Sequence, residues 1–257
     1  MSRHARFVRV TRARSFAQVA AMVLGASQIQ ASCNYSPPPV LSQGQGADTL
    51  GEQRLALAAE LGYGTVASGW NASNLSDVEV NSAAVGVGRL RYGLAPDIDL
   101  GLVGGVGPQG TIEAGPELKW RFARMAPDGA VGAPGFHAAL ISGVALGSSR
   151  FRYDLGTAPE PRHVFLAPYT GVTASGGVEL VQMFTGLRFA ASETFGSGVD
   201  DLTLYPVLAF GVQLRPTRAL TFYAEGDAAV GITTHDLSDT AMLGYPSVGM
   251  SVTFDTH

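Results

Sequence analysis

The 257-residue sequence has few charged residues, a single cysteine and no acidic residue before Asp48. Charged residues make up only 15% of the chain and hydrophobic residues 46%, a composition too apolar for a disordered protein. Cys33 has no partner cysteine, which excludes an internal disulfide. The 33 glycines argue against a helical bundle and favour a β-rich fold.

The N-terminal region lacks an apolar run long enough to cross a bilayer as a helix, which needs about 20 residues. Five arginines between Arg3 and Arg14 precede a short apolar stretch at residues 16–26. This order of a basic head and a short apolar core predicts a cleaved secretory signal over residues 1–33. A frayed basic amphipathic leader or a misassigned start of the chain is the alternative.

Cys33 ends this segment and follows Gln30, Ala31 and Ser32. These four residues resemble a bacterial lipobox, in which the Cys is acylated and becomes the new N-terminus, although Gln30 replaces the usual aliphatic residue. The alternative is an unmodified Cys close to an ordinary cleavage site. Residues 34–53 are rich in Pro, Gly and Ser and predict an extended tether.

The predicted mature chain is acidic. Removal of the five leader arginines would leave 12 Lys and Arg residues against 21 Asp and Glu residues. Binding to nucleic acid requires a basic surface that neutralises phosphates. The sequence therefore predicts no nucleic-acid partner.

Apolar and polar side chains alternate along the chain from Arg54 onward. A period of two is that of a β-strand, because the same alternation would scatter apolar side chains around a helix. The alternating runs are about 9–14 residues long, which is the length that a tilted strand needs to cross a bilayer. The predicted strands lie at 54–63, 82–93, 97–106, 111–123, 136–147, 162–175, 178–191, 201–215, 218–232 and 241–254.

These strands predict an all-β fold for residues 54–257, an up-and-down antiparallel transmembrane β-barrel of about ten strands. In such a barrel the connections should alternate between short turns and longer loops. Most of the connections follow this rule. The third, at 107–110, is short, and the fourth, at 124–135, is long, so both depart from it.

The last predicted strand carries Val248, Met250, Val252 and Phe254 on one face. It resembles the closing strand of bacterial outer-membrane barrels, which ends in an aromatic residue that the assembly machinery reads. The resemblance implies an exported protein of the bacterial outer membrane whose partners are outer-membrane lipid and the assembly machinery. It implies no particular activity.

Charged residues of both signs occupy the polar faces of the predicted strands. The lumen of a barrel of this size is narrow, and buried charges must pair. We therefore predict a structural interior held by salt bridges, with a small polar pore or ligand passage as the functional alternative. The lumen-lining candidates are Glu60, Glu113, Glu117, Lys119, Arg121, Arg188, Glu225 and Asp227, together with Arg54 and Asp99.

A surface hydrolase is a second hypothesis. The chain resembles the ten-stranded omptin proteases in strand count, and those enzymes use acidic residues and an Asp-His couple at the outer rim. The nearest residues here are Asp200 and Asp201 in the seventh connection and His235 and Asp236 in the ninth. The Asp-x-His spacing of that family is absent, and we predict that the protein is not an enzyme.

No motif points to a metal or a cofactor, and we predict neither. His137 and His163 each lack a second ligand at the spacing of a metal site. The glycine-rich stretch at 101–107 lacks the Lys and Ser or Thr of a phosphate loop and precedes no helix.

A soluble secreted β-barrel that binds an apolar ligand would show the same alternation. The two hypotheses differ in which face points outward. A membrane barrel exposes Leu118, Leu187 and Leu208 and encloses charges such as Glu117 and Lys119, whereas a soluble barrel does the reverse.

Overall fold

The computed structural model of the protein describes ten strands that form one closed antiparallel barrel. The described residues are Gly44 and 46–68, 79–107, 110–125, 135–150, 162–178, 180–195, 201–233 and 240–256. The strands are β1 (Arg54–Ser68), β2 (Glu79–Ala95), β3 (Ile98–Gly107), β4 (Thr111–Met125), β5 (Gly135–Arg150), β6 (Arg162–Gly177), β7 (Val181–Phe195), β8 (Asp201–Thr217), β9 (Leu220–Thr233) and β10 (Thr240–Asp255). Among these residues, no helix is both long and apolar enough to cross a bilayer.

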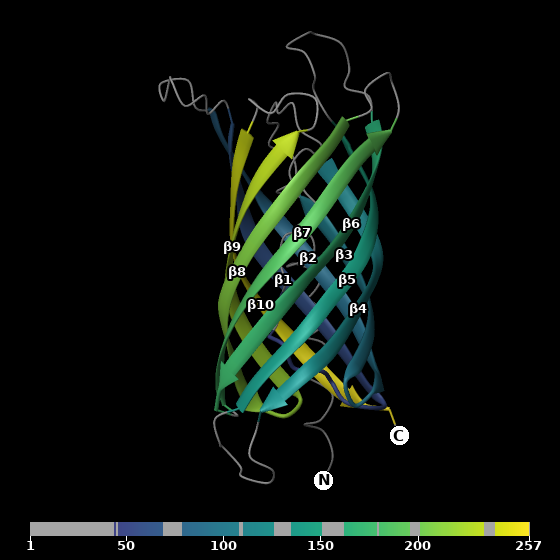
Figure 1. The fold of residues 1–257 in the computed structure, drawn as a ribbon, viewed down its shortest axis with the longest axis vertical. Helices are drawn as coiled ribbons and strands as arrows, with labels where there is room; N and C mark the ends of the chain where they lie inside the picture. The colour runs from purple at the N-terminus through teal and green to yellow at the C-terminus, as the bar shows by residue number, and fades with distance from the viewer. Residues whose placement is uncertain are drawn as a thin grey trace, which may run out of the picture.

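Each strand pairs with its neighbours in sequence, and β1 pairs with β10 to close the barrel. Arg54 at the start of β1 lies opposite Asp255 at the end of β10. Both lie at the end of the barrel drawn at the bottom of Figure 1, whose opening we call the lower mouth. The predicted all-β, up-and-down barrel of ten strands is confirmed.

Some strands are longer than the alternation predicts. β1 reaches Ser68, whereas the alternating pattern ends at residue 63. Its ladder continues beyond that point because Thr65 pairs with Ser82 of β2 and Gly244 of β10. Backbone pairing with both neighbours therefore extends the wall past the apolar band.

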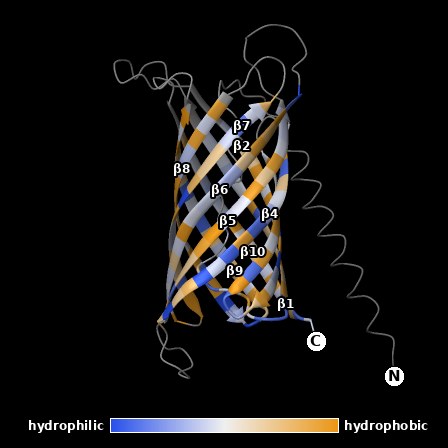
Figure 2. Cartoon of the chain, turned by 45° about the vertical axis from the view of Figure 1, so that its right-hand side comes forward, coloured by the Kyte–Doolittle hydropathy of each residue, from blue (hydrophilic) through white to orange (hydrophobic). Residues whose placement is uncertain are grey.

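The side chains face as a membrane barrel requires. Leu118, Leu187 and Leu208 are 41%, 48% and 53% exposed on the exterior. Glu117 and Lys119, the neighbours of Leu118, are 7% and 1% exposed inside the barrel. Figure 2 shows this alternation as bands of hydrophobic and hydrophilic colour along the strands. A soluble barrel with an apolar core is therefore excluded, because its apolar face would be enclosed.

Exposed aromatic side chains lie on the exterior near the lower mouth. Phe254 pairs with Leu55 near the start of β1, and Phe136 pairs with Met125 at the end of β4. Such a girdle is typical of the level of the lipid headgroups. Its members are Tyr92, Trp120, Phe122, Phe136, Phe222 and Phe254.

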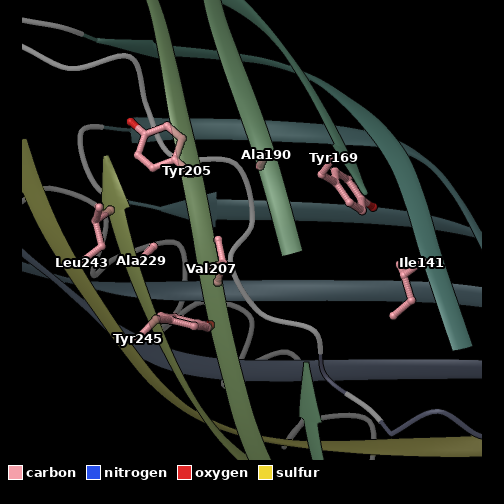
Figure 3. Close-up of a cluster of buried hydrophobic side chains, with 8 residues drawn as sticks. All are labelled: Ile141, Tyr169, Ala190, Tyr205, Val207, Ala229, Leu243 and Tyr245. Carbon is pink, nitrogen blue, oxygen red and sulfur yellow. The ribbon is translucent and has the colours of Figure 1, made fainter. Parts of the chain in front are cut away.

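Inside the barrel, aromatic rings lie over glycines of adjacent strands. A Cβ atom on Gly249 would come within 2.3 Å of the Tyr223 ring, and one on Gly143 within 2.5 Å of the Tyr169 ring. The rings therefore lie along the wall. Figure 3 shows the buried hydrophobic cluster, which consists of Ile141, Tyr169, Ala190, Tyr205, Val207, Ala229, Leu243 and Tyr245.

The contact between β4 and β5 leaves no room for a side chain at Gly115. A Cβ atom there would lie 1.7 Å from the carbonyl oxygen of Val144, whereas one on Gly88 of β2 would have nothing within 4 Å. We expect Gly115→Ala to lower the free energy of unfolding by about 1–3 kcal/mol, the usual cost of overpacking. Gly88→Ala should stay near wild type. Urea unfolding in lipid vesicles measures both variants, and equal stability would contradict the tight contact.

Candidate functional site: a polar lumen with an inserted segment

The barrel interior brings together most of the charged residues predicted to line the lumen. They come from β1, β4, β7 and β9, and all are buried. Asp99 of β3 is buried among them. The buried candidates are Glu60, Glu113, Glu117, Lys119, Arg188, Glu225 and Asp227.

Two predicted lumen residues lie at the rim instead. Arg121 places its Nη2 atom 2.6 Å from Oδ1 of Asp97 in the turn between β2 and β3. The pairing of β4 with β5 shifts register immediately after Arg121, at the end of the regular alternation. Arg54 is exposed and forms an ion pair of 3.0 Å with Asp255. Both residues lie where the strands end, so they are at the rim of the lower mouth and not in the middle of the lumen.

The sequence prediction of lumen-lining residues does not include two arginines that line the lumen. Arg89 and Arg91 of β2 point inward and are 5% and 8% exposed. Val87 precedes them on the same inward face, so the pattern of apolar and polar residues in β2 does not mark which face points inward. Arg89 forms an ion pair of 3.0 Å with Glu60, and Arg91 forms one of 3.3 Å with Asp99. The spacing of the two arginines, two residues apart, is the signal that could have found them.

Tyrosines extend this lining around the wall. The hydroxyl of Tyr169 donates a hydrogen bond of 2.9 Å to Glu117, and the guanidinium of Arg188 lies 5.4 Å from the centre of the Tyr169 ring. The hydroxyl of Tyr223 donates to Glu60 at 3.4 Å. These contacts join strands that are adjacent or next to adjacent. The result is a polar lining over part of the inner wall, which adjoins the buried hydrophobic cluster.

Gly44 and residues 46–50 lie inside the lumen. They belong to the predicted 34–53 tether, of which residues 34–43 and 45 are outside the described part of the chain. We call Gly44 and residues 46–50 the lumenal segment. Lys119 of β4 donates hydrogen bonds to the carbonyl oxygens of Gly46 and Asp48, the latter at 2.7 Å. The backbone N–H of Gly44 donates to Glu225 of β9. Because β4 and β9 are opposite in the ring of ten strands, the segment crosses the lumen.

Three further strands hold the lumenal segment. The backbone N–H of Ala47 donates to the hydroxyl of Ser175 on β6, at 3.1 Å. The backbone N–H of Gly46 donates to the side chain of Gln213 on β8, at 3.4 Å. The backbone N–H of Leu50 donates to the carboxylate of Asp99 on β3, at 3.1 Å. Most of these hydrogen bonds use backbone atoms of the segment. The residue types in the segment therefore do not indicate them.

A tight turn connects the lumenal segment to β1. Gly51 has φ of 83° and Gln53 has φ of 57°, a left-handed backbone that suits Gly51 because it has no Cβ atom. The carbonyl oxygen of Gly51 packs so closely on Gly93 of β2 that a Cβ atom on Gly93 would lie 1.7 Å away. The N–H of Gln53 donates to the carbonyl oxygen of Gly93 at 2.9 Å. This turn fixes the point at which the chain enters the lumen.

Asp48 is the charged anchor of the lumenal segment. Its carboxylate lies 2.6 Å from Nη2 of Arg215 and 3.2 Å from Nε2 of His137. Burial raises the pKa of Asp48, but the charges of Arg215 and His137 outweigh it and hold the pKa below its ordinary value of 3.8. Asp48 is therefore ionised at neutral pH and attached to the wall by its charge.

Several sequence predictions concern residues outside the described part of the chain. These are the signal segment 1–33, the lipidation candidate Cys33, and the rim residues Asp200, His235 and Asp236. The side chain of Asp201 is also outside it. His137 and His163 both point into the lumen, and among the described residues no group of three or more His, Cys, Asp or Glu is placed to hold a metal.

The barrel's construction defines its class. Its sheet has no open edge, its exterior is apolar with an aromatic girdle, and its interior is charged. Only helices and closed barrels satisfy their backbone hydrogen bonds inside a bilayer. The protein is therefore a transmembrane β-barrel. No family model and no curated protein matches the sequence.

Solved structures similar to the chain are bacterial outer-membrane barrels of low sequence identity. The N-terminal β-barrel domain of OprF from Pseudomonas aeruginosa is 12% identical, covers 76% of this chain and 97% of that chain, and has a TM-score of 0.34. A COG4313 outer membrane channel from Pseudomonas putida F1 is 12% identical, covers 88% and 100%, and has a TM-score of 0.40. The translocator domain of the autotransporter NalP from Neisseria meningitidis is 11% identical, covers 95% and 97%, and scores 0.34. The class assignment rests on the barrel's own closure and facing.

Acid should release the lumenal segment. Because the seated segment holds the pKa of Asp48 below 3.8, the seated state binds fewer protons than the released state. The contribution of Asp48 is complete above that value and is lost as the pH falls through the lowered pKa. A nitroxide at Thr49→Cys, in a Cys33→Ser background, should sharpen its spectrum only below pH 3.8.

Asp48→Asn is the control, because its amide does not titrate in this range. That variant should show no such transition while the barrel stays folded. A wild-type transition centred above pH 3.8, or one that persists in Asp48→Asn, would contradict the role assigned to this carboxylate.

Proposed function

We propose that the protein is a small, non-enzymatic polar pore of the outer membrane that the lumenal segment closes at the lower mouth. The observation that carries this proposal is the bridge from Lys119 on β4 to Glu225 on the opposite strand β9. The bridge is made by a chain segment that precedes the barrel, and such a segment can leave the lumen without unfolding the wall.

The lining supports passage of water and small hydrophilic solutes. Charged and hydroxyl groups extend around the interior, and the rings of Tyr169 and Tyr223 lie along the wall over glycines. A cavity of about 1010 Å³ opens beside the lumenal segment at the lower mouth. The segment, more than the wall, accounts for closure at this level.

A permanently closed, structural barrel is the second candidate. The ion pairs of Arg89 with Glu60 and of Arg91 with Asp99 favour it, because paired lumen charges stiffen the wall whether or not solute passes. The two candidates differ in one property, which is whether loosening the lumenal segment opens a conducting path.

Single-channel recording in planar bilayers tests the pore. We expect the wild-type barrel to be closed for most of the time. A triple variant, Lys119→Met with Ser175→Ala and Gln213→Ala, removes hydrogen bonds to the segment from β4, β6 and β8. Since each such bond contributes about 1 kcal/mol, the open probability should rise at least about tenfold.

The matched control replaces lumen-facing hydroxyls far from the segment. Ser192 and Thr203 are buried and pair with each other near the opposite end of the barrel. Ser192→Ala with Thr203→Val should therefore record like wild type. A folded triple variant without conductance steps would refute the pore and leave the structural barrel, and equal opening of the control would refute the role of the segment.

A further inference from the structure

The cavity at the lower mouth is lined by arginines from several directions. They come from β1, β2, β4, β8 and the turn between β8 and β9, so positive charge faces the cavity from around the barrel. Asp48, on the lumenal segment, is the acidic side chain among the described lining residues. The lining arginines are Arg54, Arg89, Arg91, Arg124, Arg215 and Arg218.

Several of these guanidinium groups are within reach of a solute that enters from the mouth. Arg54, Arg124 and Arg218 are exposed, with Arg54 paired to Asp255, and the side chain of Arg215 is 29% exposed. Arg89 and Arg91 are buried deeper, where they pair with Glu60 and Asp99. The accessible outer part of the cavity is therefore its most cationic part.

The contact of Asp48 indicates which kind of chemical group the cavity can bind. Its carboxylate forms an ion pair of 2.6 Å with Arg215. The planar fork of arginine fits carboxylate and phosphate groups, and it can hold either with two parallel bonds. The Asp48 carboxylate of the protein itself is therefore already paired with one arginine of the cavity.

We propose that this cavity binds a small soluble ligand with two or more phosphate or carboxylate groups, and that Asp48 holds one ligand position until the ligand displaces it. The cavity volume of about 1010 Å³ is at the upper end of small-molecule sites. The preceding 47 residues contain no Asp or Glu, so that part of the chain supplies no further anion. Binding goes beyond the pore function, because a barrel that never conducts could still bind the ligand.

Calorimetric titration of the full chain in non-ionic detergent tests the site. The probes are inorganic pyrophosphate and citrate, with sucrose as the uncharged comparison. We expect saturable binding of one or both anions at low salt, weakened as ionic strength rises, and none of sucrose. No saturable binding of either anion, or equal binding of sucrose, would overturn the proposal. The readout needs no conductance, so it fails or succeeds independently of the pore.

Three single substitutions locate the site. Arg218→Gln removes one exposed charge of the cavity and should weaken anion binding about tenfold, as loss of a charged hydrogen bond does. Arg162→Gln removes an exposed charge at the start of β6, at the opposite end of the barrel, and should leave binding unchanged. Asp48→Asn removes the internal competitor and should tighten binding. Equal losses in the two arginine variants, or no tightening in Asp48→Asn, would overturn the assignment.

Discussion

The pairing of β1 with β10 is the constraint on which the rest of the molecule depends. Inside a bilayer an unpaired backbone group costs several kcal/mol, so a sheet without edges is the condition for any strand to cross. Closure leaves two faces of opposite character. Leucines and aromatics contact lipid, and every charge must pair or meet water in the lumen, as Glu60 does with Arg89.

Some polar side chains in the lumen of this ten-stranded barrel form hydrogen bonds with the lumenal segment. Lys119, Ser175 and Glu225 bond to its backbone from three strands, while Asp48 adds one charged contact with Arg215. In the proposed pore, the same carboxylate would therefore take part both in closure and in filling the arginine-lined cavity. An anion that displaces Asp48 would loosen the segment, which links the ligand to the opening of the lumen.

Strand positions and facing could be predicted because period-two alternation is a local property. Between Ile112 and Phe122 the alternation of apolar and polar residues predicts which side chains point outward, and the burial pattern of β4 confirms it. In β2 the pattern does not mark the inward face, because Val87 shares that face with Arg89. Arg121 lies at the rim, where it pairs with Asp97 of the β2–β3 turn, a partner that the alternation does not indicate. The lumenal position of Gly44 and residues 46–50 could not be predicted, because the hydrogen bonds that hold them use backbone groups and reach residues far along the chain.

Disulfide trapping tests most directly whether the residues before β1 lie inside the barrel. In a Cys33→Ser background, Ala47→Cys should pair with Ser175→Cys, because the Ala47 N–H lies 3.1 Å from the Ser175 hydroxyl. Ser192→Cys, on β7 and farther along the lumen, is the matched control. We expect rapid, near-complete cross-linking of 47 with 175 and little of 47 with 192. Absence of the first cross-link in a folded barrel, or equal yields of both, would contradict the account.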